Sequence, residues 1–188
     1  MEKLQKLDSE LFLFLNGKGT ESLDGLWLFL TGNTTWYFVF GLLALLSIWF
    51  YKKRFWLPII ALSLSYGLAD LVSVRLFKNV FERLRPCHQP ELMEQLRLVV
   101  DSCGGQFGFV SSHAANSFAL ATAAFLLFSK NKWVGIGLFT WAAVTSYSRI
   151  YVGVHYPGDV IFGALLGVFI AWMVSKAVLL FSKKLWQT

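Results

Sequence analysis

The polar residues with the clearest capacity for chemistry lie between positions 148 and 159. Arg149 is followed six positions later by His155, and Asp159 lies four residues after that histidine. Proline is favoured in the first turn of a helix, so Pro157 is expected to open one and to place Asp159 in its first turn. A carboxylate at this spacing can accept a hydrogen bond from one imidazole nitrogen and leave the other free to attack. The pattern predicts an activated histidine nucleophile, and the alternative is a capping aspartate beside a structural histidine.

A second histidine follows two serines. Ser111, Ser112 and His113 directly precede an apolar run. Serine ahead of a helical run indicates an N-cap, and a helix N-terminus offers free N–H groups and a positive dipole end to an anion. We therefore expect His113 to lie beside a bound anion, although a capped helix with an incidental interfacial histidine has the same pattern.

Further charged residues surround the end of another apolar run. Lys78 and Arg85 are seven positions apart, so on a continuing helix they return to nearly the same face and could bind one anion together. Basic side chains that extend toward a membrane interface are the alternative. Asp70 and Arg75 lie earlier, where an ionisable group is unfavourable unless it is paired. We expect these two to pair with each other or with the site.

The segments that must position these residues are apolar enough to cross a membrane. Of the 188 residues, 56% are hydrophobic and 15% are charged, whereas soluble domains have about 25% charged residues. This composition excludes a soluble globular protein and a disordered chain. The net charge of +6 is scattered between apolar runs. It forms no basic stripe with interleaved aromatic residues, so a nucleic-acid partner is not expected.

The apolar runs predict the fold class. Crossing the hydrocarbon core takes about 20 residues and sometimes about 17, and the candidate runs are 26–50, 55–77, 113–129, 133–147 and 158–181. Leucines at positions 4, 7, 11 and 15 have helical spacing with charged residues between them, which is typical of a helix lying on a membrane surface. We expect an all-α integral membrane bundle, a single domain over residues 1–188, with about five transmembrane helices plus an N-terminal interfacial helix.

Basic residues predict the orientation of this bundle. The turns after the first and third runs and the C-terminal tail contain cations but no acidic residue: Lys52, Lys53, Arg54, Lys130, Lys132, Lys183 and Lys184. The positive-inside rule places these segments in the cytoplasm. The N-terminus and segment 78–112 then face outward, and all three polar clusters meet at that outer face. Their joint occurrence favours one catalytic site over three unrelated features.

Cys87 and Cys103 both lie in the outward segment. An oxidising compartment would allow them to form a disulfide, and two unrelated thiols are the alternative. Their spacing excludes a CxxC-type site. The Asp, Glu and His residues lack the spacing of a magnesium or zinc site, so we expect no metal and no other cofactor.

The three clusters together resemble the signature of the type 2 phosphatidic acid phosphatase superfamily. The matching order is Lys78-x6-Arg85-Pro86, then Ser111-Ser112-His113, then Ser148-Arg149-x5-His155-x3-Asp159. This superfamily includes membrane lipid phosphatases, class A bacterial acid phosphatases and vanadium haloperoxidases, and the resemblance covers about residues 60–180. Val110 and Ser112 stand where the family has the Pro and Gly of a Pro-Ser-Gly-His motif. The Ser112 side chain could crowd the approach of a phosphate to its backbone N–H.

The resemblance implies a role for each matching residue. His155 would attack phosphorus and form a phosphohistidine, with Asp159 stabilising the imidazolium and His113 protonating the departing oxygen. The phosphoryl oxygens would be bound by side chains in place of a metal, together with the N–H groups of residues 112 and 113. Those side chains are Lys78, Arg85, Arg149 and Ser111.

A short chain with an outward site is similar to bacterial undecaprenyl diphosphate phosphatases. Hydrolysis of that lipid at the outer face of the inner (plasma) membrane is therefore the expected function, and the lipid substrate and the bilayer are the expected partners. The sequence leaves the oligomeric state open. Phosphatidylglycerophosphate, phosphatidate and lipid A phosphates are alternative substrates. A lipid or ion transporter would explain Asp70 and Arg75 but not two histidines and a carboxylate at one surface, and a site that opens into lipid disfavours haloperoxidase chemistry.

Overall fold

The computed structural model describes residues 2–128 and 132–185, and within these ranges it contains helices and loops but no strand. The longer helices are α1 (Glu2–Asn16), α2 (Glu21–Thr31), α3 (Asn33–Tyr51), α4 (Trp56–Val72), α7 (Ser112–Leu127), α8 (Lys132–Tyr151) and α9 (Pro157–Leu185). The shorter elements are the 3₁₀ turns Lys52–Arg54 and Pro86–His88, the π-helix Ser73–Lys78, α5 (Asn79–Phe81) and α6 (Pro90–Met93). The predicted all-α membrane fold is confirmed.

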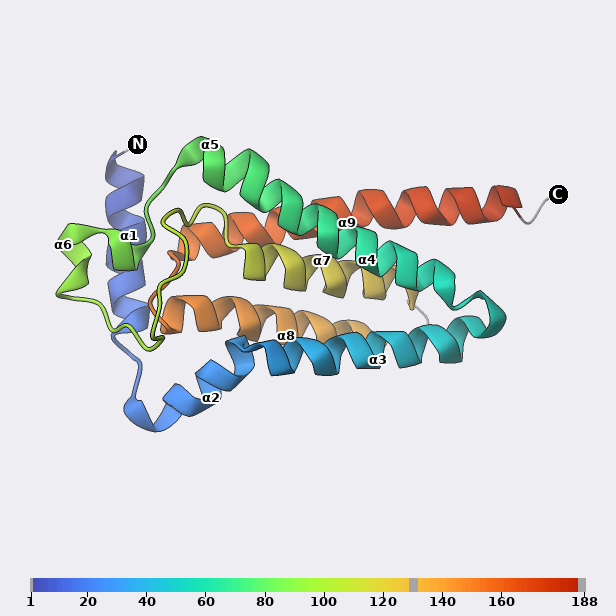
Figure 1. The fold of residues 1–188 in the computed structure, drawn as a ribbon, viewed down its shortest axis with the longest axis horizontal. Helices are drawn as coiled ribbons and strands as arrows, with labels where there is room; N and C mark the ends of the chain where they lie inside the picture. Colours follow the sequence, from blue (N-terminus) through green and yellow to red (C-terminus); the bar gives the residue numbers. More distant parts are fainter. Residues whose placement is uncertain (1, 129–131, 186–188) are drawn as a thin grey trace.

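The long helices form a bundle with distinct ends. Helices α3, α4, α7, α8 and α9 run along the long axis of the molecule, whereas α1 lies across one end (Figure 1). The turn between α3 and α4 and the end of α9 lie at the opposite end. Helix α7 packs against α4, α8 and α9, so it occupies the centre of the bundle. This arrangement puts the start of α7, the end of α8 and the start of α9 at the end covered by α1.

Small residues bring α7 and α9 into close contact. A Cβ atom added at Gly163 would lie 2.5 Å from the carbonyl oxygen of Ser111, and one added at Gly167 would overlap the backbone at Ala115. Small residues at helix interfaces allow such close approach in membranes, where dispersion contacts replace the hydrophobic effect between helices. The close packing fixes the first turn of α9 against the first turn of α7, where Ser111 N donates to Asp159 O at 2.9 Å.

Among the residues that the structure describes, three helical segments are long and apolar enough to cross a membrane: Asn33–Arg54, Trp56–Phe81 and Pro157–Ser182. The second of these combines α4, the π-helix and α5. The predicted third and fourth runs correspond to α7, with 16 residues, and α8, with 20 residues. The link between them, residues 129–131, lies outside the described residues, and with it Lys130. The count of five transmembrane helices stays a prediction.

The predicted first run, 26–50, is wrong as a single helix. Helix α2 ends at Thr31, Gly32 is extended (φ −77°, ψ 163°), and α3 begins at Asn33. Glycine has low helix propensity, and the Asn-Thr-Thr sequence after it supplies side chains that compete with the helix for backbone hydrogen bonds. Thr35 does so here, since its hydroxyl donates to Phe29 O at 2.6 Å. The break lets α2 leave the bundle axis and brings Thr31 beneath the end of α8.

Helix α1 is anchored by its polar end and leaves three of its leucines exposed, while Leu13 and Leu15 are partly buried. Leu4, Leu7 and Leu11 are exposed, whereas Phe12 is fully buried. The Asn16 amide donates to the backbone carbonyls of Ile150 and Tyr151 at 3.2 and 2.9 Å. Helix α1 is thus fixed to the end of α8 with an apolar face outward, as the predicted interfacial helix requires.

Candidate active site

The second and third polar clusters meet at the end of the bundle that α1 covers. Ser111 precedes α7, Arg149 lies in the last turn of α8, and Asp159 lies in the first turn of α9, which begins at Pro157 as predicted. His155 lies in the short connection between α8 and α9. The backbone N–H of His155 donates to Arg149 O at 3.2 Å, so the five-residue spacing closes a tight turn between the two side chains.

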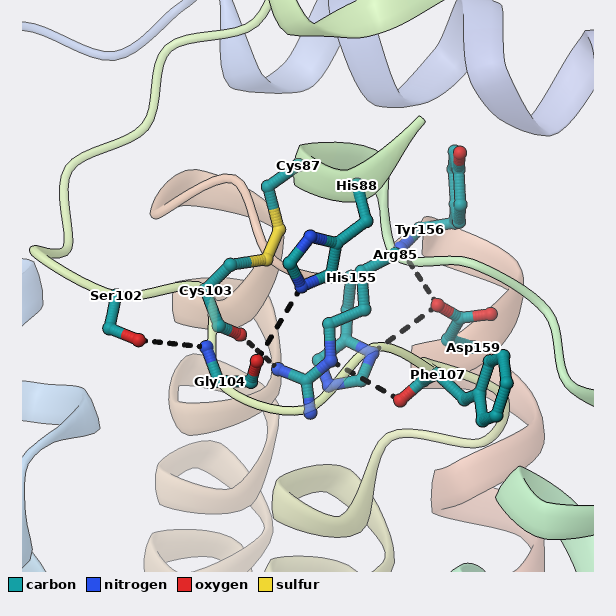
Figure 2. The surroundings of a disulfide bond; sticks show 10 residues. All are labelled: Arg85, Cys87, His88, Ser102, Cys103, Gly104, Phe107, His155, Tyr156 and Asp159. Carbon is teal, nitrogen blue, oxygen red and sulfur yellow. Dashed lines mark hydrogen bonds and ion pairs between the residues drawn. A yellow bond between two sulfur atoms is a disulfide. The ribbon is translucent and has the colours of Figure 1, made fainter. Parts of the chain in front are cut away.

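The His155 imidazole and the Asp159 carboxylate face each other in the protein interior. Nδ1 of His155 lies 3.3 Å from Oδ2 of Asp159, and the two residues are 2% and 0% exposed (Figure 2). A carboxylate can only accept, so this contact places the proton on Nδ1 and leaves Nε2 free as a nucleophile. Burial is the main reason that the pKa of His155 lies well below 6.5, and nearby Arg85 and Arg149 lower this pKa further. The imidazole is therefore neutral at pH 7.

Arg83 is a site residue that the sequence did not reveal. Its guanidinium donates to Oδ1 of Asp159 and to Oδ2 of Asp8, both at 2.8 Å. Asp8 in turn accepts from the backbone N–H of Gly158 at 2.8 Å. Arg83 thus connects α1 to the carboxylate that orients the histidine. Its two acidic partners are 75 and 76 residues away in sequence, so no local pattern could indicate them.

The route by which Lys78 and Arg85 reach the site differs from the prediction. The predicted continuous helix ends at Phe81, and Glu82 has a left-handed φ of 46°. The argument that the two cations share a helix face is therefore wrong. Both nevertheless lie close enough to His155 to lower its pKa. The turn after α5, and not a continuous helix, brings Lys78 and Arg85 to the same site.

Arg85 is enclosed by the loop that carries the two cysteines. Its guanidinium donates to Cys103 O at 2.7 Å and to Phe107 O at 3.3 Å, and the residue is 8% exposed. Cys87 and Cys103 are bonded in a disulfide with their Cα atoms 6.3 Å apart (Figure 2). Burial lowers the pKa of Arg85 from its usual value, although the group stays charged at neutral pH. The disulfide therefore closes the loop that holds a predicted phosphate-binding cation in place.

Gly108 allows this loop to cover the His155–Asp159 pair. A Cβ atom at position 108 would lie 3.1 Å from Oδ2 of Asp159 and 3.5 Å from Nδ1 of His155. It would also lie 3.1 Å from Cγ of Arg85. The two 3.1 Å distances are tighter than ordinary van der Waals contacts, so a side chain here would require the Asp159 carboxylate and the arginine to shift by a few tenths of an ångström.

Two donors near His155 have no partner among the described residues. They are Nε of Arg149 and the hydroxyl of Ser111, and both atoms are buried. Another nitrogen of Arg149 donates to the Thr31 hydroxyl. Buried polar atoms normally have hydrogen-bond partners. An anion with several oxygens would satisfy both donors, and the cations around His155 favour such an anion.

Ser112 and His113 begin α7, as predicted. The Ser112 hydroxyl lies 2.8 Å from the hydroxyl of Ser73 in the π-helix, which gives the serine at the family's glycine position a partner outside the anion site. The His113 ring packs edge-on against Trp36, with ring centroids 6.0 Å apart. His113 also lines a cavity of about 350 Å³, whose other walls include Trp36, Tyr37, Tyr66, Asp70 and Asn116.

An apolar cavity of about 310 Å³ adjoins the first one. Phe40 and Tyr66 line both cavities. The apolar walls include Leu43, Leu62 and Leu120 from three different helices. The two cavities therefore share part of their wall, and the second is lined by side chains of α3, α4 and α7.

Asp70 and Arg97 have partners in different parts of the molecule. Asp70 accepts a hydrogen bond from the Asn116 amide at 3.0 Å, so it pairs with the surroundings of the site. Arg97 forms an ion pair with Asp24 and contacts no phosphate-binding residue. Within residues 2–128 and 132–185, no three His, Cys, Asp or Glu side chains gather as a metal ligand set would require.

The comparisons with known proteins agree with the site described above. The family model of the PAP2 superfamily matches residues 58–183, which include all three polar clusters. A lipid A 4'-phosphatase of Bacteroides thetaiotaomicron is 35% identical over 92% of this chain and 77% of its own length. A lipid A 4'-phosphatase of Porphyromonas gingivalis is also 35% identical, over 99% of this chain and 78% of its own. An undecaprenyl-diphosphatase of Sulfolobus acidocaldarius is 30% identical over 87% and 75% of the two chains.

Solved structures share the fold. LpxE of Aquifex aeolicus superposes with a TM-score of 0.67 and 29% identity, over 90% of this chain and 95% of that one. A transmembrane PAP2-type phosphatidylglycerolphosphate phosphatase of Bacillus subtilis superposes with a TM-score of 0.75 over 98% and 88% of the two chains. Its identity is 22%, so it supports the fold alone.

Proposed function

This chain belongs to the PAP2 superfamily and is a multi-pass membrane lipid phosphatase, and we propose that it removes a phosphate from lipid A. The observation that carries this choice of substrate is the 35% identity to two lipid A 4'-phosphatases over nearly the whole chain. Undecaprenyl diphosphate, the substrate expected from the sequence, is the second candidate. It is favoured by the undecaprenyl-diphosphatase relative at 30% identity.

In the proposed mechanism His155 is the nucleophile. Its Nε2 lone pair forms a bond to phosphorus while the bond from phosphorus to the lipid oxygen breaks. His113 donates a proton to that departing oxygen, so the lipid leaves as a neutral alcohol. The Asp159 carboxylate, 3.3 Å from Nδ1, stabilises the positive charge that the phosphorylated imidazole acquires.

Water completes the proposed reaction. His113, now neutral, accepts a proton from a water molecule as the water oxygen attacks phosphorus. The phosphorus–nitrogen bond breaks and returns its electron pair to Nε2 of His155. Orthophosphate leaves, and both histidines regain their initial protonation states.

Charge on the transferring phosphoryl group is balanced by groups of this chain. Lys78, Arg85 and Arg149 supply positive charge, and the unpartnered Ser111 hydroxyl and Arg149 Nε supply donors that need an acceptor. The free N–H groups at the start of α7 add further donors. Because these groups are held by packing before substrate binds, they stabilise the transition state without reorganisation.

We place the active-site end at the outer face of the inner membrane. The cations Lys52, Lys53 and Arg54 lie in the turn between α3 and α4, at the end opposite to α1 (Figure 1). The positive-inside rule supports a cytoplasmic location for that turn. The disulfide lies at the active-site end, which agrees with an oxidising compartment there.

The test is phosphate release by the purified protein from four lipids in detergent: lipid A, undecaprenyl diphosphate, phosphatidate and phosphatidylglycerophosphate. We expect the highest kcat/KM with lipid A and no release by a His155→Ala control. A higher kcat/KM with undecaprenyl diphosphate would contradict the proposed substrate and favour the second candidate.

A further inference from the structure

Building on the proposed function, we propose that the cavity beside His113 binds the sugar that carries the scissile phosphate, and that the adjoining apolar cavity binds an acyl chain on that sugar. The enzyme would then select acylated sugar phosphates as a class. Four features of the two cavities lead to this inference.

The first feature is the position of the polar cavity. It contains the His113 ring in its wall, and His113 is the proposed proton donor to the leaving oxygen. The group attached to that oxygen must therefore lie on the His113 side of the phosphate. The residues that line this cavity are the ones that contact the leaving group, whatever its chemistry.

The second feature is a pair of acceptors in the wall. Asn116 is 5% exposed, and its carbonyl oxygen has no partner among the described residues although its amide nitrogen donates to Asp70. Asp70 brings a carboxylate into an apolar helix at the same place, where an ionisable side chain usually indicates function. Hydroxyl or amide N–H donors of a sugar would satisfy both acceptors. A buried acceptor left without a donor is unfavourable.

The charge of this wall also discriminates between leaving groups. Hydrolysis of a diphosphate leaves a lipid monophosphate, so a second anion would occupy the His113 side. That anion would face the Asp70 carboxylate and the Asn116 carbonyl, both of which line the cavity. Lys78 influences Asp70 electrostatically but does not line the cavity. A neutral, hydroxyl-bearing leaving group is the better match.

The third feature is a set of aromatic side chains in the same cavity. Trp36 and Tyr37 of α3 and Tyr66 of α4 line the polar cavity. Trp36 packs edge-on against both His113 and Tyr66, with ring centroids 6.0 and 5.8 Å apart, which fixes its orientation. Aromatic side chains combine a large apolar face with polar tips. Such faces pack well against the C–H face of a sugar ring whose hydroxyls point to the acceptors.

The fourth feature is the apolar cavity that continues from the sugar site. Phe40 and Tyr66 form the boundary, with their rings in edge-to-face contact at 5.5 Å. Beyond them the walls are almost entirely apolar and come from α3, α4 and α7. Helices α3 and α4 diverge from their connecting turn toward the active-site end, with α7 visible between them (Figure 1). A ligand with a polar ring and an attached hydrocarbon chain fits both compartments at once.

The test compares two synthetic lipids of equal chain length: an N-acylated glucosamine 4-phosphate and phosphatidic acid. For wild-type protein we expect a higher kcat/KM with the sugar phosphate. In Asp70→Asn and Asn116→Leu the ratio of the two kcat/KM values should fall at least tenfold. Asp101→Asn, which removes an exposed carboxylate from the outer loop, is the matched control and should keep the wild-type ratio.

The proposed binding of an acyl chain in the apolar cavity is tested by two substitutions in α3. Ala44→Phe would fill the apolar cavity and should raise KM for the acylated sugar phosphate at least fivefold. Leu45→Phe, at a neighbouring position whose side chain is 66% exposed, is its control and should leave KM unchanged. Thermal unfolding of each variant reports whether the fold is retained.

The outcomes separate this inference from the proposed function. Turnover of lipid A with equal substrate ratios in wild type, Asp70→Asn and Asn116→Leu would overturn the sugar site and leave the proposed function intact. No turnover of lipid A, together with a preference for the glucosamine phosphate that Asp70→Asn removes, would overturn the proposed substrate and support the sugar site.

Discussion

Replacement of Arg83 by glutamine tests whether the link from α1 to the histidine contributes to catalysis. Arg83 donates to Asp159 and Asp8 at 2.8 Å each, and the Asp159 side chain is fully buried. Removal of one partner of a buried ion pair costs about 3–5 kcal/mol. The Arg83 side chain is 20% exposed, and Asp159 keeps the Tyr156 N–H at 3.1 Å, so the lower end, about 3 kcal/mol, applies.

This loss should divide between stability and rate. Asp159 that is no longer held by Arg83 can rotate away from Nδ1 of His155, which weakens the orientation of the nucleophile. If about 1.4 kcal/mol of the loss falls on the transition state, kcat drops about tenfold. KM should change little because Arg83 does not belong to the proposed sugar site. The assay is steady-state phosphate release from a lipid phosphate, with thermal unfolding measured on the same samples.

Arg97→Gln is the matched control for this experiment. Arg97 pairs with Asp24 at similar exposure, 27% for its side chain, but contacts neither His155 nor Asp159. It should lower the unfolding temperature and leave kcat near the wild-type value. Equal kcat values for the two variants, measured where both are folded, would refute the positioning role of Arg83.

Three further predictions concern pH, the disulfide and topology. The pKa of His155 lies well below 6.5, mainly because of burial, so its imidazole is still neutral at pH 6.5 and its protonation should cause no loss of kcat/KM at or above that pH. An acid limb of the kcat/KM profile at or above pH 6.5 would contradict this prediction. Below pH 6.5 the His155 side chain binds a proton in the unfolded chain but not in the folded chain. The contribution of His155 to the free energy of unfolding should therefore be present above pH 6.5 and diminish as the pH falls below it. Cys103→Ser opens a loop with a sequence separation of 16 and should lower the free energy of unfolding by about 3 kcal/mol, whereas an unfolding curve identical to wild type in the absence of reductant would show that the bridge has no structural role. In intact cells an impermeant maleimide should label Glu94→Cys, an exposed position at the active-site end, and not Lys53→Cys in the opposite turn; the reverse labelling would invert the proposed orientation.

The local geometry of the candidate site was predictable because it is encoded at short range. Asp159 lies four positions after His155, across a helix start that Pro157 marks, and Ser111 directly precedes the start of α7. Spacing within one turn fixes which side chains meet, whatever the rest of the fold does. The same logic failed for Lys78 and Arg85, because it assumed a helix that ends at Phe81.

Long-range partners could not be predicted from the sequence. Arg83 meets Asp8, and Arg149 meets Thr31 across 118 residues. These contacts depend on how α1 and α2 lie across the end of the bundle. The break at Gly32 that positions α2 could not be predicted from hydropathy, because one extended glycine does not change the average hydropathy of run 26–50. The two cavities arise from packing between three helices and have no sequence signature at all.

The most direct test of the account is detection of phosphate on His155 during turnover. The protein would be mixed with lipid A that carries radioactive phosphate, quenched in alkali at millisecond intervals, and digested for peptide mapping. We predict label on the peptide that contains His155, formed before free phosphate appears, and none in His155→Ala. Release of phosphate from lipid A with label on a different residue, or with no labelled protein at any time point, would contradict the assignment of His155 as the nucleophile.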